Sequence, residues 1–378
     1  MLPTIQIFRK LLHQYPELSG EEQQTSQRVK HFIQTHYPTQ ILDQLGGHGL
    51  AAIYTFGEVG PTIFIRCELD ALPIQEPNTF PHQSKNKGIS HKCGHDGHMA
   101  IVAGLIFWLK EQAFTNGKVV LLFQPAEETG KGAYQLLQDQ RFRNLQPDYF
   151  FALHNLPGYP LHNIITKSNS FSASVQSMAI HFTGKEAHAS EPENGLHPAL
   201  AIAQIIQSVN QLNQPDLQSD DFGLVTLVHT NIGSKAYGIS PGTGELHYTI
   251  RAWTDEHRQY LEEQIAVLIA KVCQQYQLQH TIHYLEYFPA TQNDPFCNDL
   301  IHQVATNHDF VVERRPIPLK FGEDFGWFSK EYPVAMFGLG AGVDTPALHH
   351  ATYDFPDELI PAGIRMFGGL IKSILSTA

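Results

Sequence analysis

The sequence has few of the features that mark secreted, membrane-spanning or nucleic-acid-binding proteins. Its 378 residues include only four cysteines and no CxxC pair, which favours a reducing compartment over a disulfide framework. The cysteines are Cys67, Cys93, Cys273 and Cys297. No apolar run approaches the roughly 20 residues that span a bilayer. The first residues lack a charged segment followed by an apolar one, so we expect no signal peptide, no membrane and a cytoplasmic protein.

Positive charge is also scarce. The chain carries 25 Lys and Arg against 37 Asp and Glu, a net charge of -12, so no basic stripe offsets the repulsion of phosphates and we expect no nucleic-acid partner. A hydrophobic content of 42% and an aromatic content of 11% describe an ordinary globular protein. The length is too great for one ordinary core, so it predicts two domains.

Strands and helices are expected to alternate in the first part of the chain. Residues 62–69, 119–123 and 149–153 are apolar runs typical of strands covered on both faces. Polar residues follow or end these runs: Asp70, Glu127, Glu128 and His154. Because ligands of α/β proteins bind at the carboxyl ends of the strands, the pattern predicts an α/β fold with a site at this edge.

Two helices are expected before these strands. Apolar residues recur at helical spacing over 4–14, and Pro16 ends that helix. Ser19 and Glu22 have the spacing of a capping box, which predicts that a second helix opens there.

From about residue 173 the element order changes to β-α-β-β-α-β, the ferredoxin-like pattern. We therefore expect an inserted domain over 173–287. The catalytic domain would then comprise 1–172 and 288–378, where the α/β alternation resumes.

The densest group of coordinating side chains lies in 91–98, which contains one thiol, three imidazoles and a carboxylate. A buried apolar helix follows, so Cys93 and His95 are expected in a loop at a helix N-terminus, where a thiolate is favoured. Two glycines in the segment allow a tight bend. A surface loop that binds nothing is the alternative explanation for this segment taken alone.

Five candidate ligands together predict a metal site. They are Cys93, His95, Glu128, His154 and either His349 or His350. Mixed sulfur, nitrogen and oxygen donors suit Zn²⁺ or a similar ion. Because five ligands exceed the three-plus-water set of one catalytic zinc, we expect two metal ions and a bridging ligand.

Two further carboxylates have expected roles beside the metal. Glu127 would be the general base, and Asp70 would orient a ligand histidine. Each residue alone has an ordinary explanation, such as a solvated carboxylate pair, a core histidine or a turn aspartate. Their joint position at strand ends favours a site.

Nine short stretches carry a resemblance that covers nearly the whole chain. They are 12–19, 70–73, 91–98, 124–128, 153–155, 184–188, 249–251, 323–325 and 348–349. In this order they resemble the M20 metallopeptidase and amidohydrolase family, in its aminoacylase, hippurate-hydrolase and indole-acetyl-amino-acid-hydrolase branch. The resemblance implies a zinc-peptidase-like catalytic domain with a mostly parallel sheet, interrupted by an inserted ferredoxin-like lid or dimerisation domain.

The resemblance also implies residue roles and an activity. It selects His349 over His350 as the fifth ligand. It also implies two divalent metal ions, which would be zinc or, alternatively, manganese, cobalt or nickel. His188 would polarise the scissile carbonyl across a homodimer, and Arg251 would hold the substrate carboxylate. An ordinary loop histidine and a strand-edge salt bridge are the alternatives. The implied reaction is hydrolysis of the amide bond of N-acyl-L-amino acids.

Competing functions use the same sequence features. A metallocarboxypeptidase or dipeptidase on short peptides would share the metal site. An inactive metal-binding protein is disfavoured because Glu127 is present. A dinucleotide-binding oxidoreductase has support only from Gly338, Gly340 and Gly342, whose spacing is wrong. The chain departs from the family pattern at Glu68, Gly238 and Gly322, and the changes in the lid put the substrate in doubt.

Overall fold

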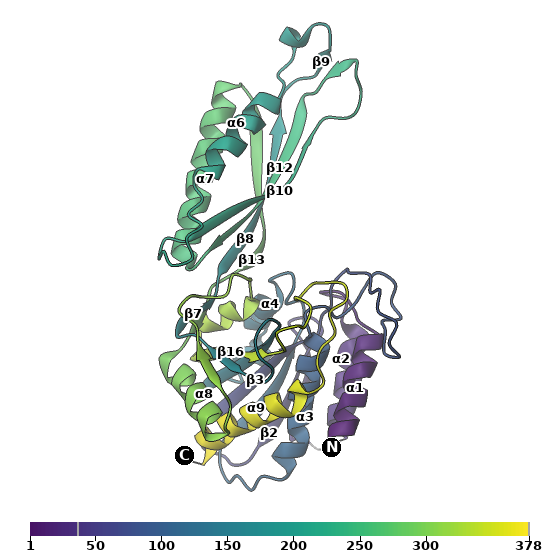
Figure 1. The fold of residues 1–378 in the computed structure, drawn as a ribbon, viewed down its shortest axis with the longest axis vertical. Coiled ribbons are helices and arrows are strands. Elements are labelled where there is room, and N and C mark those ends of the chain that lie inside the picture. Colours follow the sequence, from purple (N-terminus) through teal and green to yellow (C-terminus); the bar gives the residue numbers. More distant parts are fainter. Residues whose placement is uncertain (36–37, 377–378) are drawn as a thin grey trace. The chain divides into compact units, whose positions relative to one another are not determined.

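The computed structural model describes residues 1–35 and 38–376 and divides into two compact units (Figure 1). The first unit comprises Met1–Phe171, Thr291–Pro316 and Glu323–Ala378, and the second comprises Ser172–Ala290 and Ile317–Gly322. Residues 172, 288–290 and 317–322 were expected in the catalytic domain but belong to the second unit, and the longest of these pieces is 317–322. This segment belongs to the second unit because Leu319 pairs with Ser172 and the carbonyl of Lys320 accepts a hydrogen bond from Arg251.

The first unit is built on an eight-stranded sheet in the order β1-β2-β4-β3-β5-β16-β6-β15. The strands are β1 (Gln40–Leu45), β2 (Gly49–Thr55), β3 (Thr62–Glu68), β4 (Lys118–Gln124), β5 (Tyr149–Leu156), β6 (Ile164–Thr166), β15 (Val312–Arg314) and β16 (Val334–Gly340). The central strands β4, β3, β5 and β16 run parallel. The predicted α/β fold with a mostly parallel sheet is confirmed.

Helices cover both faces of this sheet. One face packs against α1 (Leu2–Gln14), α2 (Gln23–Gln34), α3 (His95–Lys110), α8 (Pro295–Asn307) and α9 (Leu359–Leu375). The other face meets α4 (Gly132–Gln138), α5 (Gln140–Arg143) and the 3-10 helix η2 (Asp324–Lys330). On β3, Ile63 and Ile65 join the core of the first face, while Phe64 contacts Phe142 of α5. This two-sided burial explains the continuous apolar runs of the strands. None of the described helices is long and apolar enough to cross a membrane.

The predicted capping box is wrong. Helix α2 begins at Gln23, its N-cap Glu22 makes no side-chain cap bond, and Ser19 lies upstream of the helix. The Ser19 hydroxyl instead donates to Oδ2 of Asp70 at 2.7 Å, and Oε1 of Glu22 accepts the backbone N–H of Ala126 at 2.7 Å. Both side chains satisfy buried groups beside the strand ends, which outweighs capping in the interior of the unit.

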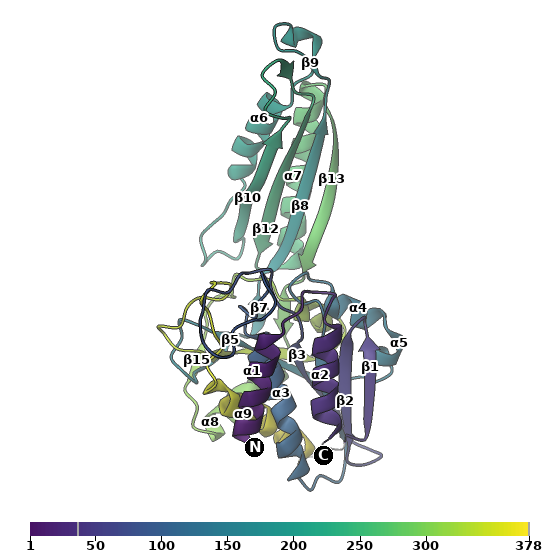
Figure 2. The same cartoon turned by 90° about the vertical axis from the view of Figure 1, so that its right-hand side faces the viewer.

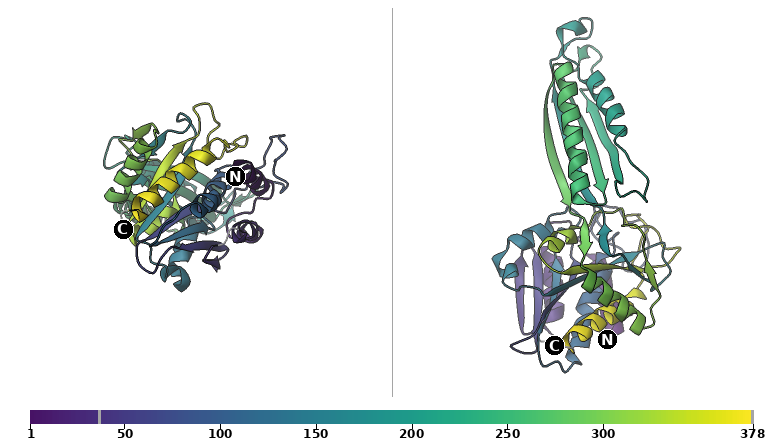
Figure 3. Two further views of the ribbon diagram at one scale, coloured as in Figure 1. Left: turned by 90° about the horizontal axis from the view of Figure 1, so that it is seen from below. Right: turned by 90° about the vertical axis from the view of Figure 1, so that its left-hand side faces the viewer.

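The second unit has one four-stranded antiparallel sheet in the order β10-β12-β8-β13. Its elements are β8 (Ser174–Thr183), α6 (Ala199–Asn210), β10 (Gly223–Ile232), β12 (Thr243–Ala252), α7 (Asp255–Gln275) and β13 (Gln279–Phe288). Their chain order is the predicted β-α-β-β-α-β pattern. Ile180 and Leu246 of the sheet pack against Ile205 and Ile269 of the helices. Figures 2 and 3 show both helices on the same face of the sheet.

Short elements complete the chain. They are β7 (Asn169–Ser172), which pairs with β14 (Thr291–Asn293), β9 (Ala187–His188), which pairs with β11 (Ile239–Ser240), and the 3-10 helix η1 (Pro192–Asn194).

Candidate metal centre

The first unit brings all five predicted ligands together, at strand ends and in adjoining loops. Sγ of Cys93 lies 3.5 Å from Nε2 of His154. Oε2 of Glu128 lies 3.6 Å from Nε2 of His349, and Oε1 lies 3.9 Å from Nε2 of His95. In two triplets every donor atom lies within 4.8 Å of the others: Cys93 with His95 and His154, and Cys93 with Glu128 and His349. Cys93 belongs to both triplets, as a bridging ligand would.

The backbone at the start of α3 places the first two ligands. The helix begins at His95 after Gly94, whose φ is 98°. A Cβ at Gly94 would approach Oδ1 of Asn155 to 2.4 Å, so glycine is required on both conformational and steric grounds. Cys93 therefore lies in the loop before the helix, as the sequence predicts, whereas His95, expected in the same loop, is the first residue of the helix.

Backbone carbonyls set the orientation of two ligand imidazoles. Nδ1 of His95 lies 2.9 Å from the carbonyl oxygen of Asp70, and Nδ1 of His154 lies 2.9 Å from that of Asn155. A carbonyl only accepts, so each Nδ1 carries hydrogen and Nε2 faces the cluster. Nε2 of His95 has no hydrogen-bond partner among the described residues.

Asp70 holds this arrangement in two ways. Its carbonyl accepts from His95, as just described, and its carboxylate Oδ1 lies 3.4 Å from the same imidazole nitrogen. Its Oδ2 accepts the hydroxyl of Ser19 and, at 2.9 Å, the N–H of Glu128. Asp70 thus links a predicted ligand histidine to the predicted ligand glutamate.

The electrostatics of the cluster suit bound cations. Burial, followed by the charges of Glu128 and Glu127, raises the pKa of Cys93 well above its usual value. Burial and the two carboxylates thus oppose the thiolate that the helix N-terminus favours. Burial also raises the pKa of Glu128 to about 7. For His95 burial lowers the pKa, but the contacts with Asp70 and Glu68 outweigh it and raise the pKa to about 10. A divalent cation would replace these protons, so the donor set fits a metal.

Glu127 lies within this cluster without belonging to either triplet that contains Cys93. Its Oε2 is 3.8 Å from Nε2 of His95, and its side chain is buried. Burial and then Glu323 and Glu128 raise its pKa well above the usual value. A carboxylate held close to the ligands with a strong tendency to take up a proton suits a general base.

A buried ion network next to the cluster was missed from the sequence. Arg66, in the middle of β3, is buried and bonds to Glu68, to Glu323 at 2.9 Å and to Asp324 at 2.9 Å. Glu68, one of the departures from the family pattern, also lies 2.6 Å from Nδ1 of His98. The available signal was the arginine itself, since a charge inside a strand covered on both faces must be paired.

The structure separates the two candidate histidines of the C-terminal loop. The His349 side chain joins the cluster, and its backbone N–H donates to the carbonyl of Lys92 at 2.8 Å. Both histidine side chains are exposed, but Nδ1 of His350 lies 2.8 Å from the Thr352 hydroxyl, away from the cluster. This geometry supports the choice of His349 that the resemblance implied.

Two of the predicted residues belong to the second unit. His188 lies on β9, is exposed, and its Nδ1 is 2.6 Å from the Ser190 hydroxyl. Arg251 lies on β12, where burial lowers its pKa, and donates to the Lys320 carbonyl at 2.8 Å. Their roles stay predictions.

Gly238 and Gly322, the other two positions at which the chain departs from the family pattern, differ in their surroundings. A Cβ at Gly238 would meet no atom of the described residues within 4 Å. A Cβ at Gly322 would approach the ring of Phe288 to 2.9 Å, so the close packing of this aromatic side chain favours glycine there.

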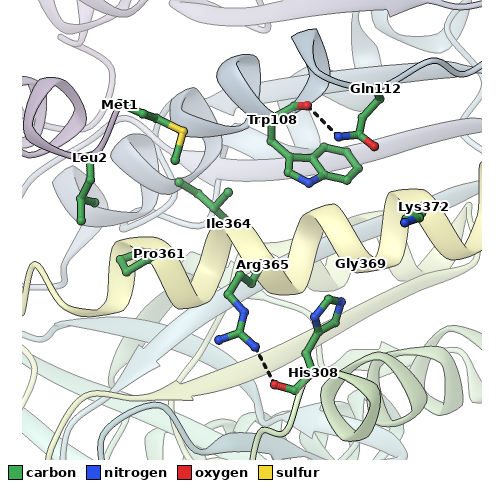
Figure 4. Close-up of a pocket in the computed structure, with 10 residues that line it drawn as sticks. All are labelled: Met1, Leu2, Trp108, Gln112, His308, Pro361, Ile364, Arg365, Gly369 and Lys372. Carbon is green, nitrogen blue, oxygen red and sulfur yellow. Dashed lines mark hydrogen bonds between the residues drawn. The ribbon is translucent and has the colours of Figure 1, made fainter.

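A separate hollow of about 400 Å³ opens beside α3 and α9 of the first unit (Figure 4). Trp108 and Ile364 line it, and Arg365 at its edge donates to the carbonyl of His308 at 2.6 Å. None of the predicted catalytic or metal-binding residues lines this hollow, so it does not compete with the cluster as the reaction site.

Comparison with known proteins gives a consistent result. Residues 64–373 match the family model described as peptidase family M20/M25/M40. The N-acetyl-L-cysteine deacetylase of Bacillus subtilis is 31% identical over 355 residues, which cover 93% of this chain and 83% of that protein. The hippurate hydrolase of Campylobacter jejuni is 29% identical over 369 residues, which cover 97% of this chain and 95% of that protein.

A solved structure is similar as well. The crystal structure of a dinuclear metal-binding peptidase from Bacillus subtilis matches with a TM-score of 0.83 and 27% identity. The match covers 100% of this chain and 99% of that one.

Proposed function

Because the chain belongs to peptidase family M20/M25/M40, we propose that it is a metal-dependent amidohydrolase that cleaves the amide bond of N-acyl-L-amino acids. The observation that carries this proposal is the cluster that brings five ligand-type side chains together, with Oε2 of Glu127 3.8 Å from Nε2 of His95. The relatives that act on acetylated and benzoylated amino acids support the substrate class.

The ligands proposed for two divalent ions are Cys93, His95, Glu128, His154 and His349. Zinc is the first candidate, because the donors mix sulfur, nitrogen and oxygen, and manganese, cobalt and nickel are the others. Such ions, when bound, supply the positive charge that polarises a substrate carbonyl and makes a water molecule more acidic.

The residues of the chain supply the remaining chemistry. Glu127 takes a proton from the attacking water and returns it to the leaving amine, so that one carboxylate acts first as base and then as acid. Asp70 holds the His95 imidazole through its carbonyl and the Glu128 backbone through its carboxylate. Burial of these groups excludes bulk water, which strengthens their electrostatic effect on the reacting atoms.

A carboxypeptidase or dipeptidase remains the second candidate, because it would use the same cluster. We would measure kcat/KM for acetyl-, benzoyl- and indole-acetyl-amino acids and for dipeptides, with zinc, manganese, cobalt and nickel in turn. The expected result is faster turnover of an acyl amino acid, with Glu127→Gln as the control for contaminating activity. Faster turnover of dipeptides would favour the second candidate, and no hydrolysis of either class would contradict both.

The second unit is proposed to act as a lid and to form a homodimer in the cytoplasm. In this proposal His188 polarises the scissile carbonyl in the partner subunit, and Arg251 holds the substrate carboxylate. Two inactive variants, Glu127→Gln and His188→Ala, should then regain part of the activity when mixed as heterodimers. Lack of recovery in heterodimers shown to form would place the complete site within one chain.

A further inference from the structure

The second unit carries its own group of histidines, on the face of the sheet opposite to α6 and α7. Figure 2 shows β10, β12, β8 and β13 side by side, and the described residues place no helix over this face. The group consists of His181 on β8, His229 on β10, Glu245 and His247 on β12, and His283 on β13. We refer to this group as the open-face cluster.

Strand register explains why these side chains meet. His229 is paired with His247 across β10 and β12, and Glu245 is paired with His181 across β12 and β8. Side chains of directly paired residues lie about 4.5–5.5 Å apart at Cβ and point to the same face. The intervening Leu246 points to the opposite face and is buried in the core with the helices. The fold therefore gathers imidazoles and a carboxylate on the open face.

The carboxylate of Glu245 is at the centre of the cluster. Its Oε1 lies 3.2 Å from Nε2 of His229. Its Oε2 lies 3.7 Å from Nε2 of His247 and 3.8 Å from Nδ1 of His181. The fourth ring, His283, has its centroid 5.5 Å from that of His181.

The three distances from the Glu245 oxygens to the imidazole nitrogens are close to those between ligands of a transition-metal ion. Zinc binds imidazole nitrogen and carboxylate oxygen at about 2.0–2.2 Å in a tetrahedral arrangement, which separates the donor atoms by about 3.3 Å. Nε2 of His247 is screened from solvent and has no hydrogen-bond partner among the described residues, although the side chain as a whole is 32% exposed. A hollow of about 240 Å³ beside the cluster is lined by His181 and Glu245.

We propose that the open-face cluster binds one divalent transition-metal ion of the zinc type, with His181, His229, His247 and Glu245 as its ligands. Imidazole nitrogens with one carboxylate oxygen are the donors that such an ion prefers over calcium or magnesium. The site lies entirely within the second unit and shares no residue with the candidate metal centre of the first unit. It therefore does not depend on the proposed catalytic function.

The test is metal analysis of the full-length protein. Metal-free protein would be dialysed against Zn²⁺, and the zinc bound per chain would be measured for wild type and for the double variant His181→Ala/His247→Ala. We expect the double variant to bind one zinc fewer per chain. His280→Ala is the matched control, because His280 is on the same sheet but its register partner Phe182 faces the helices. It should bind as much zinc as wild type.

Two further variants make the test specific. Glu245→Gln keeps the shape of the side chain and removes the anionic donor, so it should weaken binding of the same single zinc. Cys93→Ala should lose zinc from the first unit but keep the zinc that the double variant lacks. Equal zinc in wild type and the double variant would overturn the proposal. Loss of hydrolytic activity together with the zinc in the double variant would also overturn it, because the metal would then belong to the catalytic centre.

Discussion

The two units each gather histidines and carboxylates, but they do so by different means. In the first unit the donors come from loops and strand ends far apart in the sequence. Cys93, His95 and His154 are buried and Glu128 is 11% exposed, whereas His349 is 51% exposed. In the second unit the donors of the open-face cluster come from neighbouring strands, and their side chains are partly exposed, from 31% for Glu245 to 55% for His229.

The difference lies in what holds the ligands in place. In the first unit, backbone carbonyls fix the rings of His95 and His154, and the network around Arg66 stabilises the adjacent carboxylates. In the open-face cluster, strand register alone brings the rings together. The register fixes the Cβ positions of the histidines, but the rings can still rotate. A site that performs chemistry needs the first kind of support, because a small misplacement of a reacting group is costly.

The largest expected effect is the loss of catalysis when the base is removed from the first unit. Glu127→Gln keeps the shape of the side chain and all five proposed ligands, but it cannot take up the proton from water. General-base catalysis contributes about 10²–10⁴-fold, so kcat should fall at least that far. Steady-state kinetics and metal analysis on the same samples would show low turnover with metal content near that of wild type.

The neighbouring glutamate is the control. Glu128→Gln removes a proposed ligand, so this variant should lose metal as well as activity. If Glu127→Gln loses metal while Glu128→Gln only slows turnover, the roles of the two residues are exchanged.

The next largest effect concerns the stability of the first unit. Arg66→Met would leave the buried carboxylates of Glu68, Glu323 and Asp324 without their cation. Breaking a buried ion pair costs about 3–5 kcal/mol, so the urea midpoint should fall clearly. Lys30→Met is the control, because Lys30 forms an exposed pair with Asp43 that should contribute less than about 1 kcal/mol. Equal shifts in the two variants would show that the Arg66 network has no special role in stability.

The elements that could be predicted from the sequence are those whose side chains follow a regular pattern. The apolar runs of β3, β4 and β5 and the order of elements in the second unit agree with the structure. Strands β6 and β15 were not predicted because they have only three residues each, and β1 was not predicted because most of its residues are only partly buried. The helix start at Ser19 was wrong because tertiary contacts with Asp70 decide the position of that hydroxyl.

The sequence was sufficient to predict the side chains of the candidate site whose chemical type alone indicates metal binding. Carboxylates, imidazoles and a thiol at strand ends and in adjoining loops indicated the cluster before any distance was known. Glu22 and the carbonyl contacts could not be identified in this way, because their roles depend on which segments meet in space. For Arg66 the sequence indicates that a partner is needed, but not which carboxylates supply it. The open-face cluster was also missed, because its histidines are far apart in the sequence and only the register of β8, β10 and β12 unites them.

The smallest expected effect is the one that tests the contrast between the clusters most directly. Without metal, the open-face cluster is a set of partly exposed side chains, so His181→Ala should change the unfolding free energy by no more than about 0.5 kcal/mol. In the presence of zinc the variant should be less stable than wild type, since a ligand at 100 times its Kd stabilises the folded state by about 2.7 kcal/mol. Thermal unfolding of wild type, His181→Ala and His280→Ala with and without zinc would measure this difference. A large loss of unfolding free energy in metal-free His181→Ala would mean that the histidines stabilise the sheet without a metal. The open-face cluster would then resemble the metal centre of the first unit more than its exposure indicates.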